Sequence, residues 1–244
     1  MSGFKQVLAC AAALALTTGA TAAERYAYKF TRPLKYRTVL LSEGQFSLPD
    51  GTPRKMKLEA VSTVQLTPVG QDAHGFQVTT ETLRTMTRMD DREVPAPKPA
   101  DSKRTVTVGP DGAITGGGES TFAIVFPAKA LSKGDSFTEE RATPAGGPAL
   151  PLKTVYTVAD TAATVPGYAG AVTLFEARSE LSGKPQGRQL TLKEGGGKVW
   201  FDAAAGLLVK SHLAYVFSEE TPLPGGQSGG SRVTTVHYES ELAK

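Results

Sequence analysis

The chain has 244 residues, with 27 Lys and Arg against 24 Asp and Glu, which gives a formal net charge of +3. No basic run is interleaved with aromatic residues, which argues against nucleic acid as a partner. A single cysteine, Cys10, and three histidines far apart in the sequence offer no metal-ligand spacing, so we expect neither a metal nor a cofactor.

The first 23 residues have the pattern of an export signal. Lys5 supplies the positive start, Val7–Ala20 is the apolar stretch, and Thr21-Ala22-Ala23 is a small-residue cleavage site. We therefore expect residues 1–23 to be removed and the mature protein to be exported to the bacterial periplasm or beyond. No later stretch is long and apolar enough to be a membrane-spanning helix.

The residues that follow show strand patterns rather than helical periodicity. Asp90–Lys103 contains three prolines at alternate positions and predicts an extended, solvated loop. Thr221–Ser231 is rich in Pro and Gly and predicts a flexible loop before the last strand. In chain order the strands are expected around Tyr26–Phe30, Val39–Leu41, Met56–Leu66, Gly75–Met86, Thr105–Val108, Phe122–Phe126, Leu152–Asp160, Ala169–Leu181 and Arg232–Leu242.

The clearest element is a hairpin over Lys198–Phe217. Asp202 and Gly206 punctuate it: Gly206 suits the left-handed position of a turn, and Asp202 can accept hydrogen bonds from loop amides. Alternation then places Leu207, Val209, Leu213 and Tyr215 on one face, which we expect to be apolar. Trp200 is expected to lie half-buried at the edge of a groove. Trp200, Leu207, Val209, Leu213 and Tyr215 are therefore the candidate ligand-binding residues.

A shift of 94 residues aligns the chain with itself. Thr105–Val108 then lies over Val199–Asp202, Gly112 lies over Gly206, and the Asp90–Lys103 loop lies over Lys184–Gly197, which ends in three glycines. We interpret this as an internal duplication. The predicted organisation is a signal peptide (1–23), two similar β halves (24–118 and 119–218), and a flexible loop with a terminal strand (219–244). The fold class is all-β, an antiparallel curved sheet or half-barrel with minimal helix.

Two serines match catalytic patterns without the context that these patterns need. Ser228 lies in Gly-Gln-Ser-Gly-Gly, but its flanks are Pro and Gly rather than a strand and a helix. Ser136 lies in Gly-Asp-Ser-Phe, which also reads as a polar turn entering a strand. We therefore expect no catalytic residues.

Two stretches carry a resemblance to known proteins. Residues 126–137 show the pattern FPxKxLxxGDSF, and residues 197–211 show GxVxFDxxxGxLVxS. Together they resemble an uncharacterised family of exported bacterial β-rich proteins, with Phe137 where a Trp is common. That resemblance implies no activity, cofactor or binding residue. The expected architecture is also similar to half-barrel carriers of lipids or lipoproteins.

These features favour an exported, non-catalytic β-protein of the bacterial envelope. Its partner would be an apolar ligand or an apolar segment of an envelope protein. A structural or adhesion-type module is the alternative, and a hydrolase is third. An open apolar sheet face would favour the carrier, whereas a filled core would favour the structural module.

Overall fold

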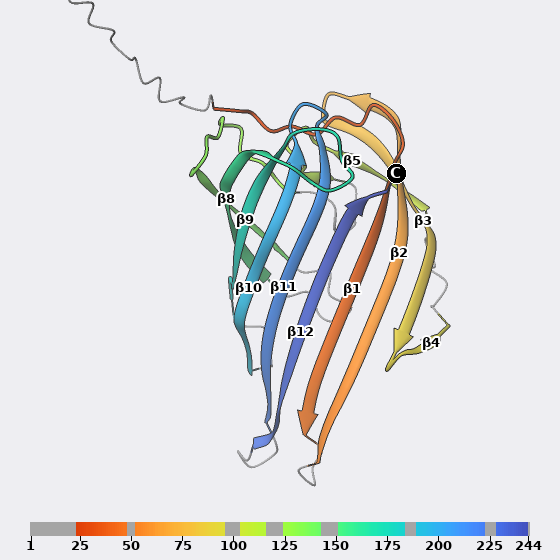
Figure 1. Cartoon of the computed structure of the whole chain (residues 1–244), viewed down its shortest axis with the longest axis vertical. Helices are drawn as coiled ribbons and strands as arrows, with labels where there is room; N and C mark the ends of the chain where they lie inside the picture. Colours follow the sequence, from red (N-terminus) through yellow and green to blue (C-terminus); the bar gives the residue numbers. More distant parts are fainter. Residues whose placement is uncertain are drawn as a thin grey trace, which may run out of the picture.

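The structure, a computed structural model, describes residues 23–47, 52–95, 103–115, 124–142, 151–183, 189–222 and 228–243. They form one antiparallel sheet of twelve strands, and no helix occurs among them. The sheet is strongly curved and does not close: its middle strands lie in front in Figure 1, and its two edges turn away from the viewer. The predicted all-β, curved antiparallel fold is confirmed. Most of the predicted export signal, residues 1–22, lies outside the described part of the chain.

The strands are β1 (Leu34–Ser47), β2 (Pro53–Asp72), β3 (Gly75–Met89), β4 (Arg92–Val94), β5 (Lys103–Val108), β6 (Ile114–Thr115), β7 (Ser136–Ala142), β8 (Pro151–Ala163), β9 (Val172–Leu181), β10 (Gln189–Asp202), β11 (Leu207–Pro222) and β12 (Ser228–Leu242).

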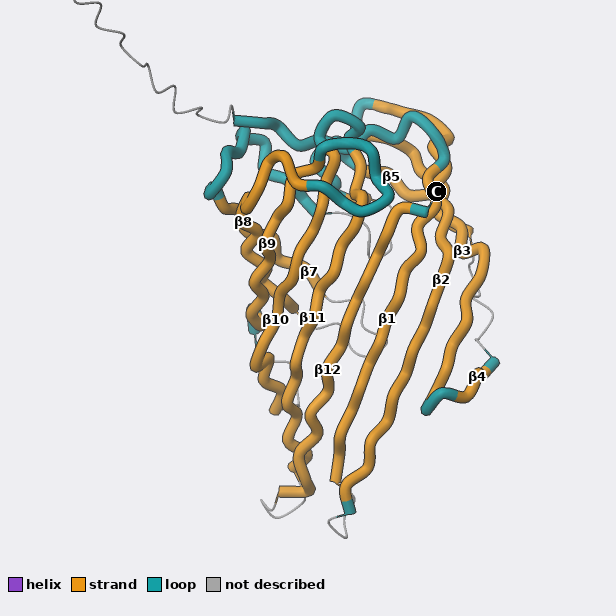
Figure 2. Tube along the Cα trace, in the orientation of Figure 1, coloured by secondary structure: helices purple, strands orange, loops and turns teal. Residues whose placement is uncertain are grey.

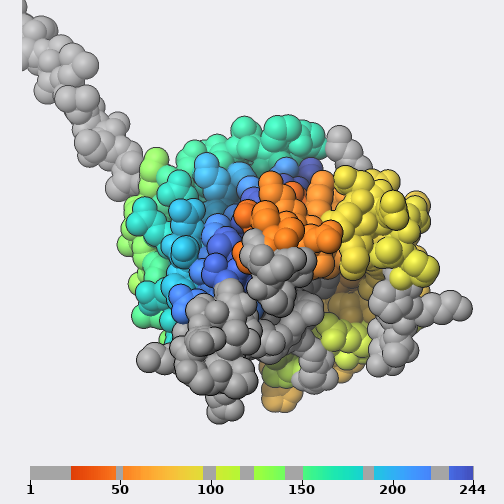
Figure 3. Space-filling view, turned by 90° about the horizontal axis from the view of Figure 1, so that it is seen from below, coloured from red at the N-terminus to blue at the C-terminus, as the bar shows by residue number. Residues whose placement is uncertain are grey.

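The last strand of the chain is central to the sheet. The order is β6-β5-β3-β2-β1-β12-β11-β10-β9-β8-β7, with β4 beside β3. β12 therefore pairs with β1 on one side and with β11 on the other, and it joins the N-terminal strands to the C-terminal ones (Figure 2). Figure 3, seen from below, shows these two groups of strands on opposite sides of β1 and β12.

The hairpin that the sequence predicts over Lys198–Phe217 is confirmed as β10 and β11. Gly206 has a φ of 66°, and its N–H donates to the Asp202 carbonyl oxygen at 2.7 Å. The Asp202 carboxylate also accepts from the Ala205 N–H at 2.7 Å. One difference is a register shift, which leaves Val209 without a partner in β10 and interrupts the expected alternation.

Two other expectations need correction. The alternating segment Tyr26–Phe30 is not a strand; it crosses the upper end of the sheet, and its N–H groups bond to turn carbonyls instead. The glycine run Gly195–Gly197, which the 94-residue shift aligns with the predicted Asp90–Lys103 loop, is not in a loop, because all three residues lie within β10. The sequence does not predict a strand at these glycines, since glycine is usually depleted in strands.

The packed core occupies the end of the sheet that is uppermost in Figure 1. Tyr26 and Tyr28 from the crossing segment pack edge-on against Phe201, with ring centroids 6.1 and 5.1 Å away. Phe126, from a second irregular segment, lies 4.8 Å from Phe201 and 5.4 Å from Tyr26. This aromatic cluster seals one end of the curved sheet.

Candidate ligand-binding face

Two faces of the sheet can be told apart from its register, because directly opposed residues share a face. Tyr36 lies on the core side, and it is 2% exposed. Counting by twos along β1, Thr38, Leu40, Ser42 and Gly44 lie on this same face. We call it the concave face, since it lies inside the curve and carries the core.

Below the sealed end, the opposed residues of five adjacent strands form cross-strand rows on the concave face. The row nearest the core is made of hydroxyl residues: Ser211, Ser240, Thr38, Ser62 and Thr85. The next rows are Leu213–Tyr238–Leu40–Ala60–Thr87, Tyr215–Val236–Ser42–Leu58–Met89 and Phe217–Thr234–Gly44–Met56. We call these last three rows the concave patch.

The concave patch contains no charged residue. It spans about 19 Å across five strands and about 13 Å along them, from the spacings of an ordinary sheet. Leu40, Leu58, Val236 and Tyr238 are only partly buried, and Met89 at its edge is 43% exposed. Charge returns in the following row, where Arg232 opposes Glu219 in β11 and Phe46 in β1. An apolar surface with a charged rim at its far end is the result.

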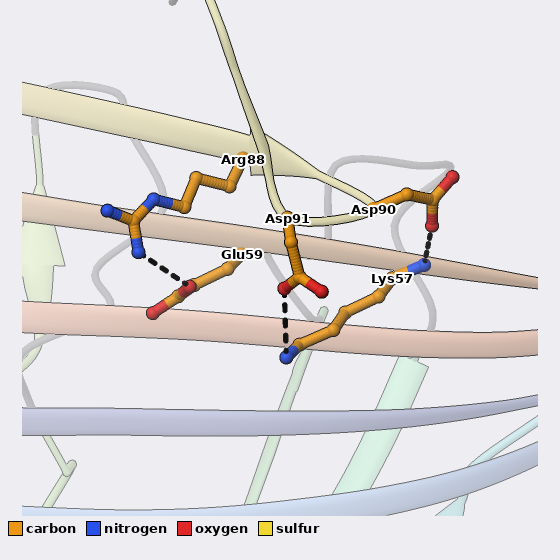
Figure 4. Close-up of polar contacts among 5 residues, drawn as sticks. All are labelled: Lys57, Glu59, Arg88, Asp90 and Asp91. Carbon is orange, nitrogen blue, oxygen red and sulfur yellow. Dashed lines mark hydrogen bonds and ion pairs between the residues drawn. The ribbon is translucent and has the colours of Figure 1, made fainter.

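The opposite, convex face carries the charges. Figure 4 shows this on β2 and β3, where Arg88 lies 4.0 Å from Glu59 and the Lys57 Nζ lies 3.6 Å from Asp91. The Lys57 N–H also donates to the Asp90 carboxylate at 2.8 Å. Further ion pairs across neighbouring strands on this face are Lys153–Glu180 and Lys210–Glu241, and the His212 Nε2 lies 3.8 Å from the Glu239 carboxylate. Over the three rows of the concave patch, the sheet therefore has one charged face and one uncharged face, which keeps the concave side apolar there.

At the sealed end the concave face encloses a small apolar cavity of about 30 Å³. Tyr28, Tyr36, Val78 and Leu207 are among the residues around it. Burial raises the pKa of Tyr36, whose hydroxyl donates to the Leu208 carbonyl oxygen at 2.8 Å. Burial also raises the pKa of Tyr26, whose hydroxyl is 3.2 Å from the Thr173 hydroxyl. These phenols are neutral partners in a packed core and not acid–base groups.

The five candidate binding residues from the sequence do not form one site. Leu213 and Tyr215 lie in the concave patch, and Leu207 lies at the sealed end beside the small cavity. Val209 lines a different pocket, beneath the loop between β8 and β9. Trp200 opposes Lys210, so it lies on the convex face, half-buried, while its neighbours Val199 and Phe201 are 2% and 0% exposed on the other side.

Other residues of the concave patch escaped sequence reasoning. Leu40 stands between Val39 and Leu41, and three apolar residues in a row give no indication of which one faces inward. Leu58, Val236 and Tyr238 alternate with polar residues, but alternation alone does not show which strands are neighbours. The register supplies that information.

Among the described residues no nucleophilic site surrounds Ser136, and the Ser228 side chain lies outside the described part of the structure. Ser136 begins β7, and its hydroxyl is 2.8 Å from the Thr157 hydroxyl of β8. Asp135 accepts from the Ser132 N–H at 2.8 Å in a turn where Gly134 has a φ of 90°. Ser228 begins β12, and residues 223–227 before it lie outside the described chain. No group of His, Cys, Asp and Glu among the described residues could hold a metal ion.

Comparisons with known proteins give little. No family model and no curated protein matches this chain, so the resemblance to an exported family has no matching model. The chain is similar to lipovitellin in a structure on lipid–protein interactions, with a TM-score of 0.48, 10% identity and 88% of this chain covered. It spans 26% of the length of that lipovitellin chain.

A second similar structure is DynF from the dynemicin biosynthesis pathway of Micromonospora chersina. Its TM-score is 0.24 at 13% identity, with 93% of this chain and 92% of that chain covered. Neither likeness carries an argument about function. Within the described residues, no helix is both long and apolar enough to cross a membrane.

Proposed function

We propose that this protein is an exported, non-catalytic binding protein of the bacterial envelope. Its ligand is an apolar molecule, or an apolar segment of another protein, held on the concave patch. Export is supported by the signal-like pattern around Lys5 and Val7–Ala20.

The observation that carries the proposal is the difference between the two faces beyond the sealed end. A solvated sheet face normally bears charges, as the convex face does here. The concave patch instead keeps Leu40, Leu58, Val236 and Tyr238 partly exposed with no charge among its three rows. Apolar surface retained in a concave position is the feature that ligand sites of this kind share.

Leu40 and Leu41 provide a matched test. Both are partly buried neighbours in β1, but Leu40 opposes Ala60 and Tyr238 on the concave face, whereas Leu41 opposes Glu59 and His237 on the convex face. The mature protein and the variants Leu40→Gln and Leu41→Gln would be titrated with the neutral fluorescent probe N-phenyl-1-naphthylamine.

We expect Leu40→Gln to weaken probe binding about tenfold, because the loss of one buried apolar contact costs about 1.4 kcal/mol. Leu41→Gln should leave the affinity unchanged. If both variants weakened probe binding equally, or if the probe did not bind at all, the carrier hypothesis would be rejected in favour of the structural module.

A further inference from the structure

A second pocket lies on the convex side, between the β8–β9 loop and the strands β11, β12 and β1. It has a volume of about 630 Å³, within the range of small-molecule sites. Figure 1 shows the loop passing in front of the upper ends of β10 and β11. Its lining includes no residue of the concave patch.

The lining of this pocket is basic on one side and apolar on the other. Arg32, Lys35 and Arg37 come from the start of β1 and the segment before it. Val165, Val209 and Leu242 supply an apolar surface from the loop and from β11 and β12. Val209 reaches this pocket because the register shift in β11 leaves it outside the regular pairing with β10, and at 2% exposed it forms part of the pocket floor.

The charges of this pocket are unbalanced. Glu241 is the one acidic side chain in the lining, and its carboxylate lies 3.6 Å from the Lys210 Nζ. Among the described residues, no carboxylate lies within ion-pair distance of Arg32, Lys35 or Arg37. Three cations beside an apolar surface therefore face an open space, which suits an anion.

The loop wall is held in place. The Tyr168 hydroxyl donates to the Asp202 Oδ2 at 2.6 Å, and Asp202 is itself buried in the β10–β11 turn. The Tyr168 N–H also donates to the Val165 carbonyl oxygen at 3.0 Å. The pocket is thus bounded by a loop that is fixed to the sheet.

We propose that this pocket is a second binding site, which takes a small amphiphilic anion with a phosphate or carboxylate head and a short apolar tail. The head lies against Arg32, Lys35 and Arg37, and the tail lies against Val165, Val209 and Leu242. This site does not depend on the function proposed for the concave patch.

The test is calorimetric titration of the full mature chain with octyl phosphate, 1-octanol and inorganic phosphate at low salt. Octyl phosphate carries head and tail, and the other two carry one each. We expect octyl phosphate to bind at least about tenfold more tightly than either of them, and added salt to weaken its binding.

Two double variants that remove the same amount of positive charge test whether octyl phosphate binds in this pocket. Lys35→Gln with Arg37→Gln removes two pocket cations, and Arg84→Gln with Lys103→Gln removes two exposed cations of β3 and β5 that do not line the pocket. We expect only the first pair to weaken octyl phosphate binding, by about tenfold.

The two proposed sites can be tested independently of each other. Leu40→Gln should leave octyl phosphate binding intact, and Lys35→Gln with Arg37→Gln should leave N-phenyl-1-naphthylamine binding intact. The second site would be overturned if both double variants weakened octyl phosphate binding equally. It would also be overturned if inorganic phosphate or 1-octanol bound as tightly as octyl phosphate. The neutral probe would still report on the concave patch.

Discussion

At the scale of single residues, Asp202 links two parts of the chain that lie far apart in the sequence. Its Oδ1 accepts from the Ala205 N–H within the turn, and its Oδ2 accepts from the Tyr168 hydroxyl of the β8–β9 loop. Burial, and then the hydrogen bond to Asp202, raise the pKa of Tyr168 to about 12 from its usual 10.0. The folded state therefore holds the phenol proton more tightly than the unfolded state does.

We expect Tyr168→Phe to lower the free energy of unfolding by about 1–2 kcal/mol at neutral pH, because the variant loses a hydrogen bond to a buried carboxylate. Since the folded pKa is raised, the stability that Tyr168 contributes is full below pH 10.0 and is lost as the pH rises through about 12. Urea unfolding of both proteins across this range measures the difference. A difference that stays constant up to pH 12 would contradict this account.

The sequence predicts residues of this kind only in part. That Asp202 would accept from loop amides follows from its place before a turn, and the structure confirms it. Its partner Tyr168 is 34 residues away, and no local pattern connects them. The sequence also shows neither the strand register nor the register shift in β11. Alternation alone therefore placed Trp200 and Val209 in one predicted site with Leu213 and Tyr215.

At the scale of elements, β10 is unusual because it contains three consecutive glycines. Gly197 has a φ of 153°, and a Cβ added there would lie 2.0 Å from the His212 carbonyl oxygen of β11. Glycine is therefore what allows β10 to pair closely with its neighbour at this point. Gly44 of β1 differs, since a Cβ there would meet nothing closer than the Arg232 side chain at 3.7 Å.

We expect Gly197→Ala to lower the free energy of unfolding by more than about 2 kcal/mol, because it adds both a backbone clash and a strained conformation. Gly44→Ala, the same change in an uncrowded strand, should alter stability by less than about 1 kcal/mol. Chemical unfolding midpoints of the two variants give the comparison. Similar midpoints would mean that β10 can shift to accept a side chain.

Most of the strands could be predicted, because their alternation of apolar and polar residues is local information. The crossing segments could not. Tyr26, Tyr28 and Phe126 lie in segments that alternate like strands. Their alternation arises because one side of each segment packs across the end of the sheet. Their backbones make single hydrogen bonds, such as that from the Tyr28 N–H to the Pro110 carbonyl oxygen. Alternation reports a buried face and does not require a paired strand.

At the scale of the whole molecule, the strands of the two predicted halves lie on opposite sides of β12. β1, β2, β3 and β5 follow one another outward from β12, and β11 to β7 fill the other side of the sheet. At the 94-residue offset, Thr105–Val108 and Val199–Asp202 both lie in strands, and Gly112 and Gly206 both have positive φ, 93° and 66°. That the halves superpose stays a prediction, together with their boundaries at residues 118 and 218.

The halves are also interlocked at the sealed end. The Lys29 N–H of the first half donates to the Gly206 carbonyl oxygen of the second at 2.8 Å. The Phe126 N–H of the second half donates to the Asp111 carbonyl oxygen of the first, also at 2.8 Å. Each leading segment thus closes the turn of the other half. Beyond this, β12 pairs with strands of both.

This arrangement predicts that the chain from residue 24 onward unfolds as one cooperative unit and not as two domains. Trp200, the single tryptophan, lies in the second half, whereas far-UV circular dichroism reports strands of both halves. Because neither half keeps its aromatic cluster without the other, the urea transitions seen by Trp200 fluorescence and by circular dichroism should coincide. If dichroism shows an additional transition that Trp200 does not sense, the first half is stable by itself. The shared core around Tyr26, Phe126 and Phe201 would then be less important than its packing indicates.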